Sequence, residues 1–144
     1  MAISVIIPCG YFSNSDLEND RLIKFTKQLE SFQYIDFGIN DELVFIEQSP
    51  NIRLCVLISD FVEKLNCKKT YSYLKPREED QGFFNQSLCK NEGIKIAKNE
   101  NLLFINSDII LKYLNDMEKG INISKGSTKG ARSYSRLNSL KSIN

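Results

Sequence analysis

The stretch from Phe83 to Leu111, FFNQSLCKNEGIKIAKNENLLFINSDIIL, predicts a helix, a short turn and a buried strand that ends in three polar residues. In its first half, apolar residues recur at helical spacing. The residues expected on the apolar helix face are Phe84, Leu88, Ile94 and Ala97. Residues 102–105 form an apolar run that is short enough for a strand and too short for an independent helix. Open α/β sheets bind ligands outside the carboxyl ends of their strands, so the triplet Asn106-Ser107-Asp108 marks the expected functional site.

Three further apolar runs predict the other strands, at residues 3–7, 43–46 and 70–74. Large apolar residues at helical spacing predict a helix over residues 20–34, and a short helix is expected over 109–117. Residues 51–65 favour a helix, although 54–58 alone would suit a strand. This alternation of strands and helices predicts an α/β fold, with a mostly parallel sheet flanked by helices.

The composition excludes several classes of site. The 144 residues contain no histidine, which rules out Ser-His and Cys-His catalysis. The four cysteines lack the CxxC spacing of zinc sites, so buried reduced thiols are expected. No apolar run approaches the roughly 18–20 residues of a membrane span, and the N-terminus MAISVIIPCG has no basic region typical of a signal peptide. We therefore expect a cytoplasmic protein.

Charge is divided unevenly along the chain. Residues 119–144 hold six basic and no acidic residues and sum to +6, whereas the other 13 basic and 18 acidic residues sum to −5. The same segment is rich in Gly, Ser, Lys and Asn, a composition typical of a loose tail. The expected organisation is a folded domain over residues 1–118 and a basic tail over 119–144.

Three interpretations of the basic tail stay open. It is a solubilising end, a lid that folds over a charged ligand, or a patch that contacts acidic membrane or other polyanions. No specific recognition of nucleic acid is expected.

Three segments resemble the nucleotide-sugar half of GT-A-type glycosyltransferases, and inverting family two in particular. They are SVIIP at residues 4–8, ELVFIEQS at 42–49 and FNQSLCKNEGIKIAKNENLLFINSDI at 84–109. The resemblance covers about residues 3–114. It implies a Rossmann-like GT-A fold that binds a nucleotide-diphosphate sugar, most simply a UDP-sugar, and transfers the sugar to a hydroxyl group of a glycan or another acceptor.

The resemblance also implies site residues. The loop beside the nucleotide base would consist of Pro8, Cys9 and Gly10. Glu47 would replace the acid that contacts the base or ribose at the end of the second strand, and Lys90-Asn91 would match an Arg-Asn pair. The Asp-x-Asp motif would correspond to Asn106, Ser107 and Asp108, with Asp108 as a ligand of Mn²⁺ or Mg²⁺.

This sequence departs from the family pattern in ways that affect function. Asn106 replaces the first aspartate, and Lys90 keeps the charge of arginine but loses its bidentate fork. Family domains usually continue past Asp-x-Asp through an acceptor region and a general base, so this chain is expected to be a short or partial version. No catalytic residue is assigned.

Each assignment has a simpler alternative. Asp108 or Ser107 would serve equally as the N-cap of a following helix. Glu47 would be an ordinary solvated acid, and Lys90-Asn91 part of a solvated helix face. Three tyrosines, Tyr11, Tyr71 and Tyr73, either stack on a uracil or serve in packing.

Three functions therefore remain in view from the sequence. The first is an active glycosyltransferase. The second is a noncatalytic binding or assembly module, a shortened transferase that keeps the donor-binding fold and has lost turnover. The third is an unrelated doubly wound protein whose Asn-Ser-Asp triplet only caps a helix.

Overall fold

Four parallel strands form one sheet in the order β3-β2-β1-β4 in the computed structural model, which describes residues 2–10, 16–50 and 54–110. The strands are β1 (Ile3–Cys9), β2 (Glu42–Glu47), β3 (Lys68–Tyr73) and β4 (Asn101–Phe104). β1 and β2 are buried along their whole length, as expected for central strands covered on both faces. The apolar runs of the sequence thus predicted each strand to within two residues at either end.

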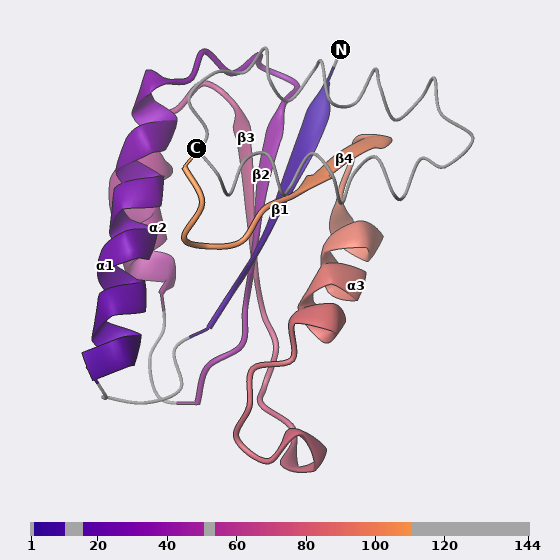
Figure 1. Cartoon of the computed structure of the whole chain (residues 1–144). Coiled ribbons are helices and arrows are strands. Elements are labelled where there is room, and N and C mark those ends of the chain that lie inside the picture. Colours follow the sequence, from indigo (N-terminus) through magenta and orange to yellow (C-terminus); the bar gives the residue numbers. More distant parts are fainter. Residues whose placement is uncertain (1, 11–15, 51–53, 111–144) are drawn as a thin grey trace.

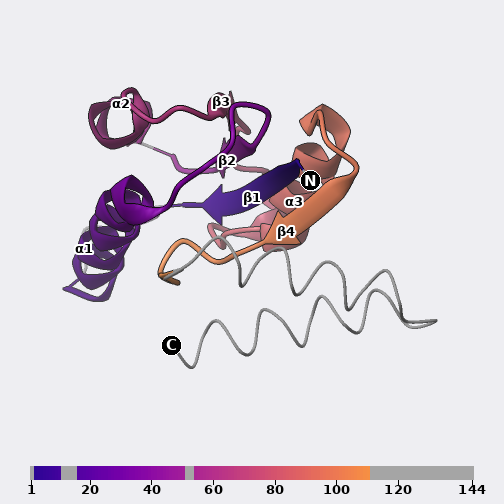
Figure 2. The ribbon, with the colours of Figure 1, turned by 90° about the horizontal axis from the view of Figure 1, so that it is seen from above.

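Helices cover both faces of the sheet and make a three-layer α/β arrangement (Figures 1 and 2). One face carries α1 (Asp16–Ser31), which continues into the 3₁₀ turn η1 (Phe32–Tyr34), and α2 (Cys55–Val62). The other face carries α3 (Gln86–Ile96), which follows the 3₁₀ turn η2 (Glu78–Asp80). The helix alternative for the segment before β3 is therefore confirmed. The helix predicted from residue 20 begins four residues earlier, at Asp16.

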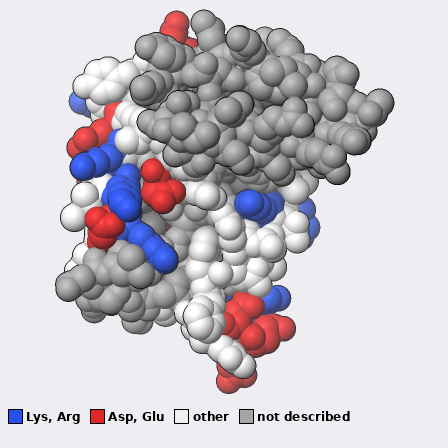
Figure 3. All heavy atoms as spheres, in the orientation of Figure 1, with Lys and Arg blue, Asp and Glu red and all other residues white. Residues whose placement is uncertain are grey.

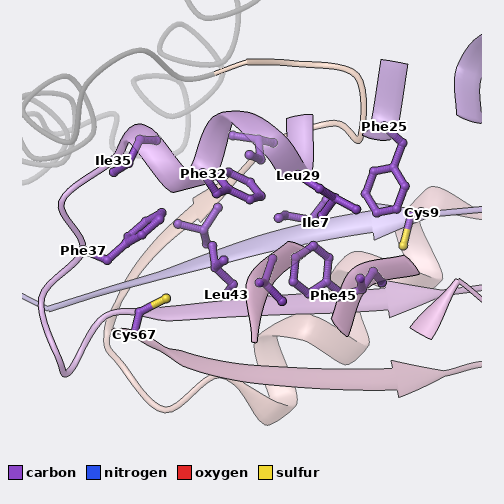
Figure 4. Packing of buried hydrophobic residues seen from close by; sticks show 14 of the residues in the cluster. Ile7, Cys9, Phe25, Leu29, Phe32, Ile35, Phe37, Leu43, Phe45 and Cys67 are labelled. Carbon is purple, nitrogen blue, oxygen red and sulfur yellow. The ribbon is translucent and has the colours of Figure 1, made fainter. Parts of the chain in front are cut away.

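Alternate residues of each central strand point to opposite layers of the core. Val5 and Ile7 of β1 and Phe45 of β2 lie in the cluster under α1 and α2, where Phe25 meets Phe45 edge to face with ring centroids 6.4 Å apart (Figure 4). Ile6 belongs to the cluster under α3. The sheet therefore has no solvated face over β1 and β2.

The buried side of α3 differs from the side predicted from its sequence. Ile94, expected on the apolar face, is 50% exposed, whereas Cys89 and Gly93 are buried against the sheet. A Cβ added at Gly93 would lie 2.4 Å from Cγ2 of Ile6. The helix comes this close to β1 because position 93 carries no side chain. A glycine counts as neither apolar nor polar in a helical pattern, yet here it decides which side of the helix is buried.

Replacing Gly93 with Ala tests this close approach. Glycine-to-alanine changes in an exposed helix interior stabilise by about 1 kcal/mol, but overpacking a buried contact costs about 1–3 kcal/mol. We expect Gly93→Ala to lower the free energy of unfolding in urea by about 1 kcal/mol, whereas Ser87→Ala, at an exposed position of the same helix, leaves it nearly unchanged. A more stable Gly93→Ala variant would contradict the close packing.

Several sequence predictions concern parts outside the described residues. The helix expected over 109–117 lies outside them except for Ile109 and Ile110, as does the tail at 119–144. Within the described part of the chain, no helix is both long and apolar enough to cross a bilayer. The four cysteines are free thiols, and Cys9, Cys67 and Cys89 are buried.

Candidate functional site

The strand order reverses beside β1. From β1 the chain moves outward to β2 and β3 on one side, then returns to place β4 on the other side of β1. In open α/β sheets, ligands bind at such a reversal, outside the carboxyl ends of the strands. The residues that follow β1 and those that follow β4 therefore meet at the edge of the sheet where a ligand is expected.

A cavity of about 300 Å³ lies at this reversal. The end of β1 with the residue after it and the turn after β4 contribute five of its lining residues. The rest come from α1 and from the starts of α2 and α3. The lining consists of Cys9, Gly10, Arg21, Leu22, Phe25, Leu54, Phe84, Gln86, Asn106, Ser107 and Asp108. The apolar side chains of the lining are Leu22, Phe25, Leu54 and Phe84, and its charged groups are the Arg21 guanidinium and the Asp108 carboxylate. This mixture of apolar side chains and a few polar groups is typical of small-molecule sites.

The polar triplet after β4 forms a turn that two helices hold. Within the turn, the Ile109 N–H donates to the Asn106 carbonyl at 3.2 Å. From α1, Gln28 Nε2 donates to the carbonyls of Asn106 at 2.7 Å and of Ile109 at 2.6 Å. From α3, Gln86 Nε2 donates to Asn106 Oδ1 at 2.6 Å. The turn leaves the Asp108 side chain exposed at the cavity.

Glu47 reaches the same edge of the sheet but does not line the cavity. It is paired with Cys9 in the parallel register, and its side chain is 0% exposed. Its carboxylate accepts hydrogen bonds from the hydroxyls of Ser49 and Tyr71 and from the Leu54 N–H at 2.9 and 3.0 Å. Neighbouring donors therefore enclose this acid in the structure, and its contact with the base or ribose of a donor stays a prediction.

Burial, together with the nearby Glu47 carboxylate, keeps two neighbouring side chains protonated. Burial and the hydrogen bond to Glu47 raise the pKa of Tyr71 far above its usual value, so this phenol stays a neutral donor. Burial, with the negative charge of Glu47 as a second cause, raises the pKa of the Cys9 thiol well above its usual value. Cys9 therefore lines the cavity as an uncharged thiol and not as a nucleophile.

The tyrosines of β3 are engaged inside the protein. Tyr71 donates to Glu47, and Tyr73 donates to the Ser49 carbonyl at 2.5 Å. Neither ring is among the cavity residues. Of the two interpretations of these rings, stacking on a uracil or packing in the sheet, the structure agrees with packing in the sheet. Tyr11 lies outside the described residues.

Lys90 and Asn91 also lie away from the cavity lining. The first turn of α3 stands at the carboxyl edge, and the helix then runs back along the sheet, so a residue one turn further has left the edge. Lys90 Nζ lies 6.0 Å from the ring centroid of Phe104, and Asn91 is exposed. Gln86, one turn earlier, occupies the cavity position instead.

The start of α3 is fixed independently of these residues. Asn85 caps the helix, since its Oδ1 accepts from the Leu88 N–H at 2.9 Å. Its own N–H donates to Gln48 Oε1 at 2.8 Å. The residue after β2 thereby ties α3 to the sheet and determines where Phe84 and Gln86 stand.

Acidic side chains gather at the lower end of the molecule, outside the cavity lining (Figure 3). Side chains of Glu78, Glu79 and Asp80 gather over η2, beyond the ends of the strands (Figure 3). Arg77 Nε and Nη2 donate to Asp80 at 2.9 and 3.0 Å, and this pairing lowers the pKa of Asp80. The negative charge of these side chains makes them an unsuitable contact for a phosphate group.

Sequence reasoning missed the cavity residues that come from helices. Arg21, Leu22 and Phe25 belong to α1, while Leu54 and Phe84 precede α2 and α3. One general signal was available, because in a parallel sheet each helix that follows a strand begins at the ligand-binding edge. That signal identifies the first turns of the helices but not which of their side chains point inward.

The sequence matches no protein-family model and no curated protein. Similar solved structures include S. aureus TarS, a GT-A glycosyltransferase, with 25% identity and a TM-score of 0.59 over 87% of this chain and 20% of that chain. TarS 1–349 gives 23% identity and a TM-score of 0.63 over 87% of this chain and 33% of that chain. TarS 1–349 in complex with UDP gives 22% identity and a TM-score of 0.57, with the same coverage.

These structures establish the fold. This chain spans a fifth of the length of the first and a third of the other two. The GT-A-type α/β fold predicted from the sequence is confirmed, and the chain fits the nucleotide-sugar half of that fold.

Proposed function

We propose that this chain binds a UDP-linked sugar in the cavity at the strand-order reversal and takes part in transferring the sugar to a hydroxyl acceptor. One observation carries the proposal. The segments after β1 and β4 converge on a single cavity, in a fold similar to that of a glycosyltransferase whose structure was determined with UDP. The apolar side chains of the lining suit a flat base, and the polar turn after β4 suits the charged diphosphate.

The residues of the turn fit a weakly held divalent cation. Asp108 offers an exposed carboxylate and Ser107 a hydroxyl, whereas Asn106 Oδ1 already accepts from Gln86. Among residues 2–10, 16–50 and 54–110, no three His, Cys, Asp or Glu side chains come together as a metal site. Mg²⁺ and similar ions often bind through one or two carboxylates together with substrate phosphates. We therefore propose that Asp108 holds Mn²⁺ or Mg²⁺ only together with the diphosphate, whose negative charge the ion would neutralise.

The other candidate residues receive different roles. We propose that Pro8, Cys9 and Gly10 provide the backbone beside the base, with Cys9 and Gly10 in the cavity lining. We propose that Glu47 acts on the donor through Leu54, whose N–H it binds. Lys90 and Asn91 lie outside the cavity lining, which Gln86 joins in their place. We propose that they contribute to donor binding only at long range, through the positive charge of Lys90 and the polarity of Asn91.

A noncatalytic donor-binding module is the second candidate. Two features of the triplet favour it. Asp108 is its only carboxylate, and the side-chain oxygen of Asn106 already accepts a hydrogen bond from Gln86. Measuring UDP release from UDP-glucose and UDP-N-acetylglucosamine separates the candidates. Turnover above the uncatalysed rate supports a transferase, whereas tight donor binding without turnover supports the binding module.

The cytoplasm is the location that we propose for this activity. All four cysteines are free thiols, which suits a reducing compartment. Contact with an acidic membrane surface through the basic segment at 119–144 is an additional proposal, because its net charge of +6 attracts anionic lipids.

Titration calorimetry with UDP tests the proposal. We expect UDP to bind more tightly with Mn²⁺ than with EDTA, by about tenfold, equivalent to 1.4 kcal/mol. UMP, which lacks the second phosphate, should show little of this gain because a bridging ion needs two phosphate groups. Absence of UDP binding at millimolar concentration, with and without Mn²⁺, would contradict the proposed function.

A further inference from the structure

Gln28 joins α1 to the turn that follows β4. Its amide Nε2 donates to two main-chain carbonyls, that of Asn106 at 2.7 Å and that of Ile109 at 2.6 Å. These residues lie 78 and 81 positions away along the chain. One side chain therefore spans the turn and holds both of its ends, with Ser107 and Asp108 between them.

Gln28 is a polar side chain in a buried environment, which is unfavourable unless its amide makes hydrogen bonds that compensate. Gln28 is 0% exposed, and the buried residues near it in sequence are Phe25 and Leu29 of α1 and Phe32 of η1. Within the described residues, its Oε1 is one of two buried side-chain polar atoms without a hydrogen-bond partner. A buried acceptor left unpaired is unfavourable, and an apolar residue of similar size would avoid this cost. The favourable contribution of this side chain is thus its pair of donated hydrogen bonds.

A second amide fixes the same turn from the opposite face of the sheet. Gln86, at the beginning of α3, donates to the Asn106 side chain at 2.6 Å. Gln28 holds the backbone of the turn and Gln86 holds its first side chain. Asp108 is left as the exposed carboxylate of the turn, on a backbone fixed from both layers of helices.

We propose that Gln28 is a positioning residue, which fixes the backbone of the turn from Asn106 to Ile109 and thereby directs the Asp108 carboxylate toward a cation–diphosphate ligand. The part of this inference that concerns the ligand rests on the proposed function. The part that concerns the turn does not. Residues that orient a metal ligand without touching the metal typically change metal affinity by 10–100-fold when they are replaced.

The test compares Gln28→Met with Gln33→Met. Methionine keeps the length and bulk of glutamine but cannot donate, and Gln33 is an exposed residue of η1 that serves as the matched control. Each variant is measured for thermal unfolding, for hydrogen exchange at the Ile109 amide, and for UDP affinity with Mn²⁺ and with EDTA. Gln28→Asn, whose amide is one methylene too short to reach both carbonyls, replaces Gln28→Met if that variant does not fold.

We expect the exchange at the Ile109 amide to become about tenfold faster in Gln28→Met, because the carbonyl that accepts this N–H loses its second partner. The gain in UDP affinity from Mn²⁺ should fall about tenfold relative to the wild type. Affinity in EDTA should stay within about twofold, since the metal-free contacts are untouched. Gln33→Met should change none of these quantities.

Two results would overturn the inference. One is unchanged exchange at Ile109 together with an unchanged Mn²⁺ gain. The other is an equal loss of affinity with and without Mn²⁺, which indicates a general structural defect instead of a displaced carboxylate. A wild-type protein that binds UDP without any Mn²⁺ gain would overturn the cation part of the proposed function itself, and the exchange rates would then show separately whether Gln28 fixes the turn.

Discussion

Replacing Asp108 with Asn is expected to remove the gain in UDP affinity that Mn²⁺ provides. The substitution keeps the shape of the side chain but removes its negative charge, and Asp108 is the carboxylate that the turn presents to the cavity. A divalent cation shared between a carboxylate and two phosphates loses its protein ligand when the charge is lost. We expect the ratio of the UDP dissociation constants in EDTA and in Mn²⁺ to fall from about ten to about one.

The UDP affinity measured in EDTA distinguishes the loss of a metal ligand from a folding defect, because a folding defect would weaken binding in EDTA as well. Without the cation, the Asp108 carboxylate repels the diphosphate, so Asp108→Asn should bind UDP in EDTA as well as the wild type or slightly better. Asp36→Asn, an exposed acid outside the cavity, is the matched control and should keep the full Mn²⁺ gain. A variant at Asp108 that retains this gain would exclude the carboxylate as the metal ligand.

The second large effect is expected at Glu47, on stability. Glu47→Gln keeps the size of the side chain but turns an acceptor-only group into an amide whose NH₂ opposes the donors around it. The hydroxyls of Ser49 and Tyr71 and the Leu54 N–H then lose at least one acceptor in a fully buried place. Breaking hydrogen bonds to a buried charge costs about 2–4 kcal/mol. We expect the free energy of unfolding in urea to fall by about 3 kcal/mol.

The same substitution should also weaken UDP binding, because Leu54 lines the cavity and loses the partner that fixes its backbone. Glu30→Gln, at an exposed position of α1, is the matched control and should change stability by less than about 0.5 kcal/mol. If Glu47→Gln unfolds at the same urea concentration as the wild type, the hydrogen bonds of Glu47 contribute little to stability, and the expectation of a structural role for this residue is contradicted.

The contrast between Asp108 and Glu47 shows how far sequence reasoning reaches in this protein. Both residues follow apolar runs, so both were placed correctly at the carboxyl edge of the sheet. The structure then separates them: Asp108 is exposed at the cavity, whereas Glu47 is enclosed by donors from Ser49, Leu54 and Tyr71. A strand position fixes where a residue stands along the sheet, but its exposure depends on what the neighbouring strand and helix place against it.

The residues of α3 give a second example. Helical periodicity predicted the helix but assigned Ile94 to its buried side, whereas the structure buries Gly93 against Ile6. The family pattern directed attention to Lys90 and Asn91, but Gln86 is the residue of α3 that lines the cavity. Each difference has its own physical cause. The close approach of this helix to β1 buries Gly93 instead of Ile94, and the direction of the helix away from the carboxyl edge takes Lys90 and Asn91 away from the cavity.

The sequence by itself determined the order of strands and helices, the α/β class and the polar turn after β4, because apolar runs and helical spacing are local properties of the chain. Only the tertiary structure decided that Glu47 is buried, that Gln28 holds the turn of Asp108, and that a cavity forms between the ends of β1 and β4, helix α1 and the starts of α2 and α3. These features join residues that are far apart in the sequence. Their geometry depends on strand register and layer packing, which no local pattern contains.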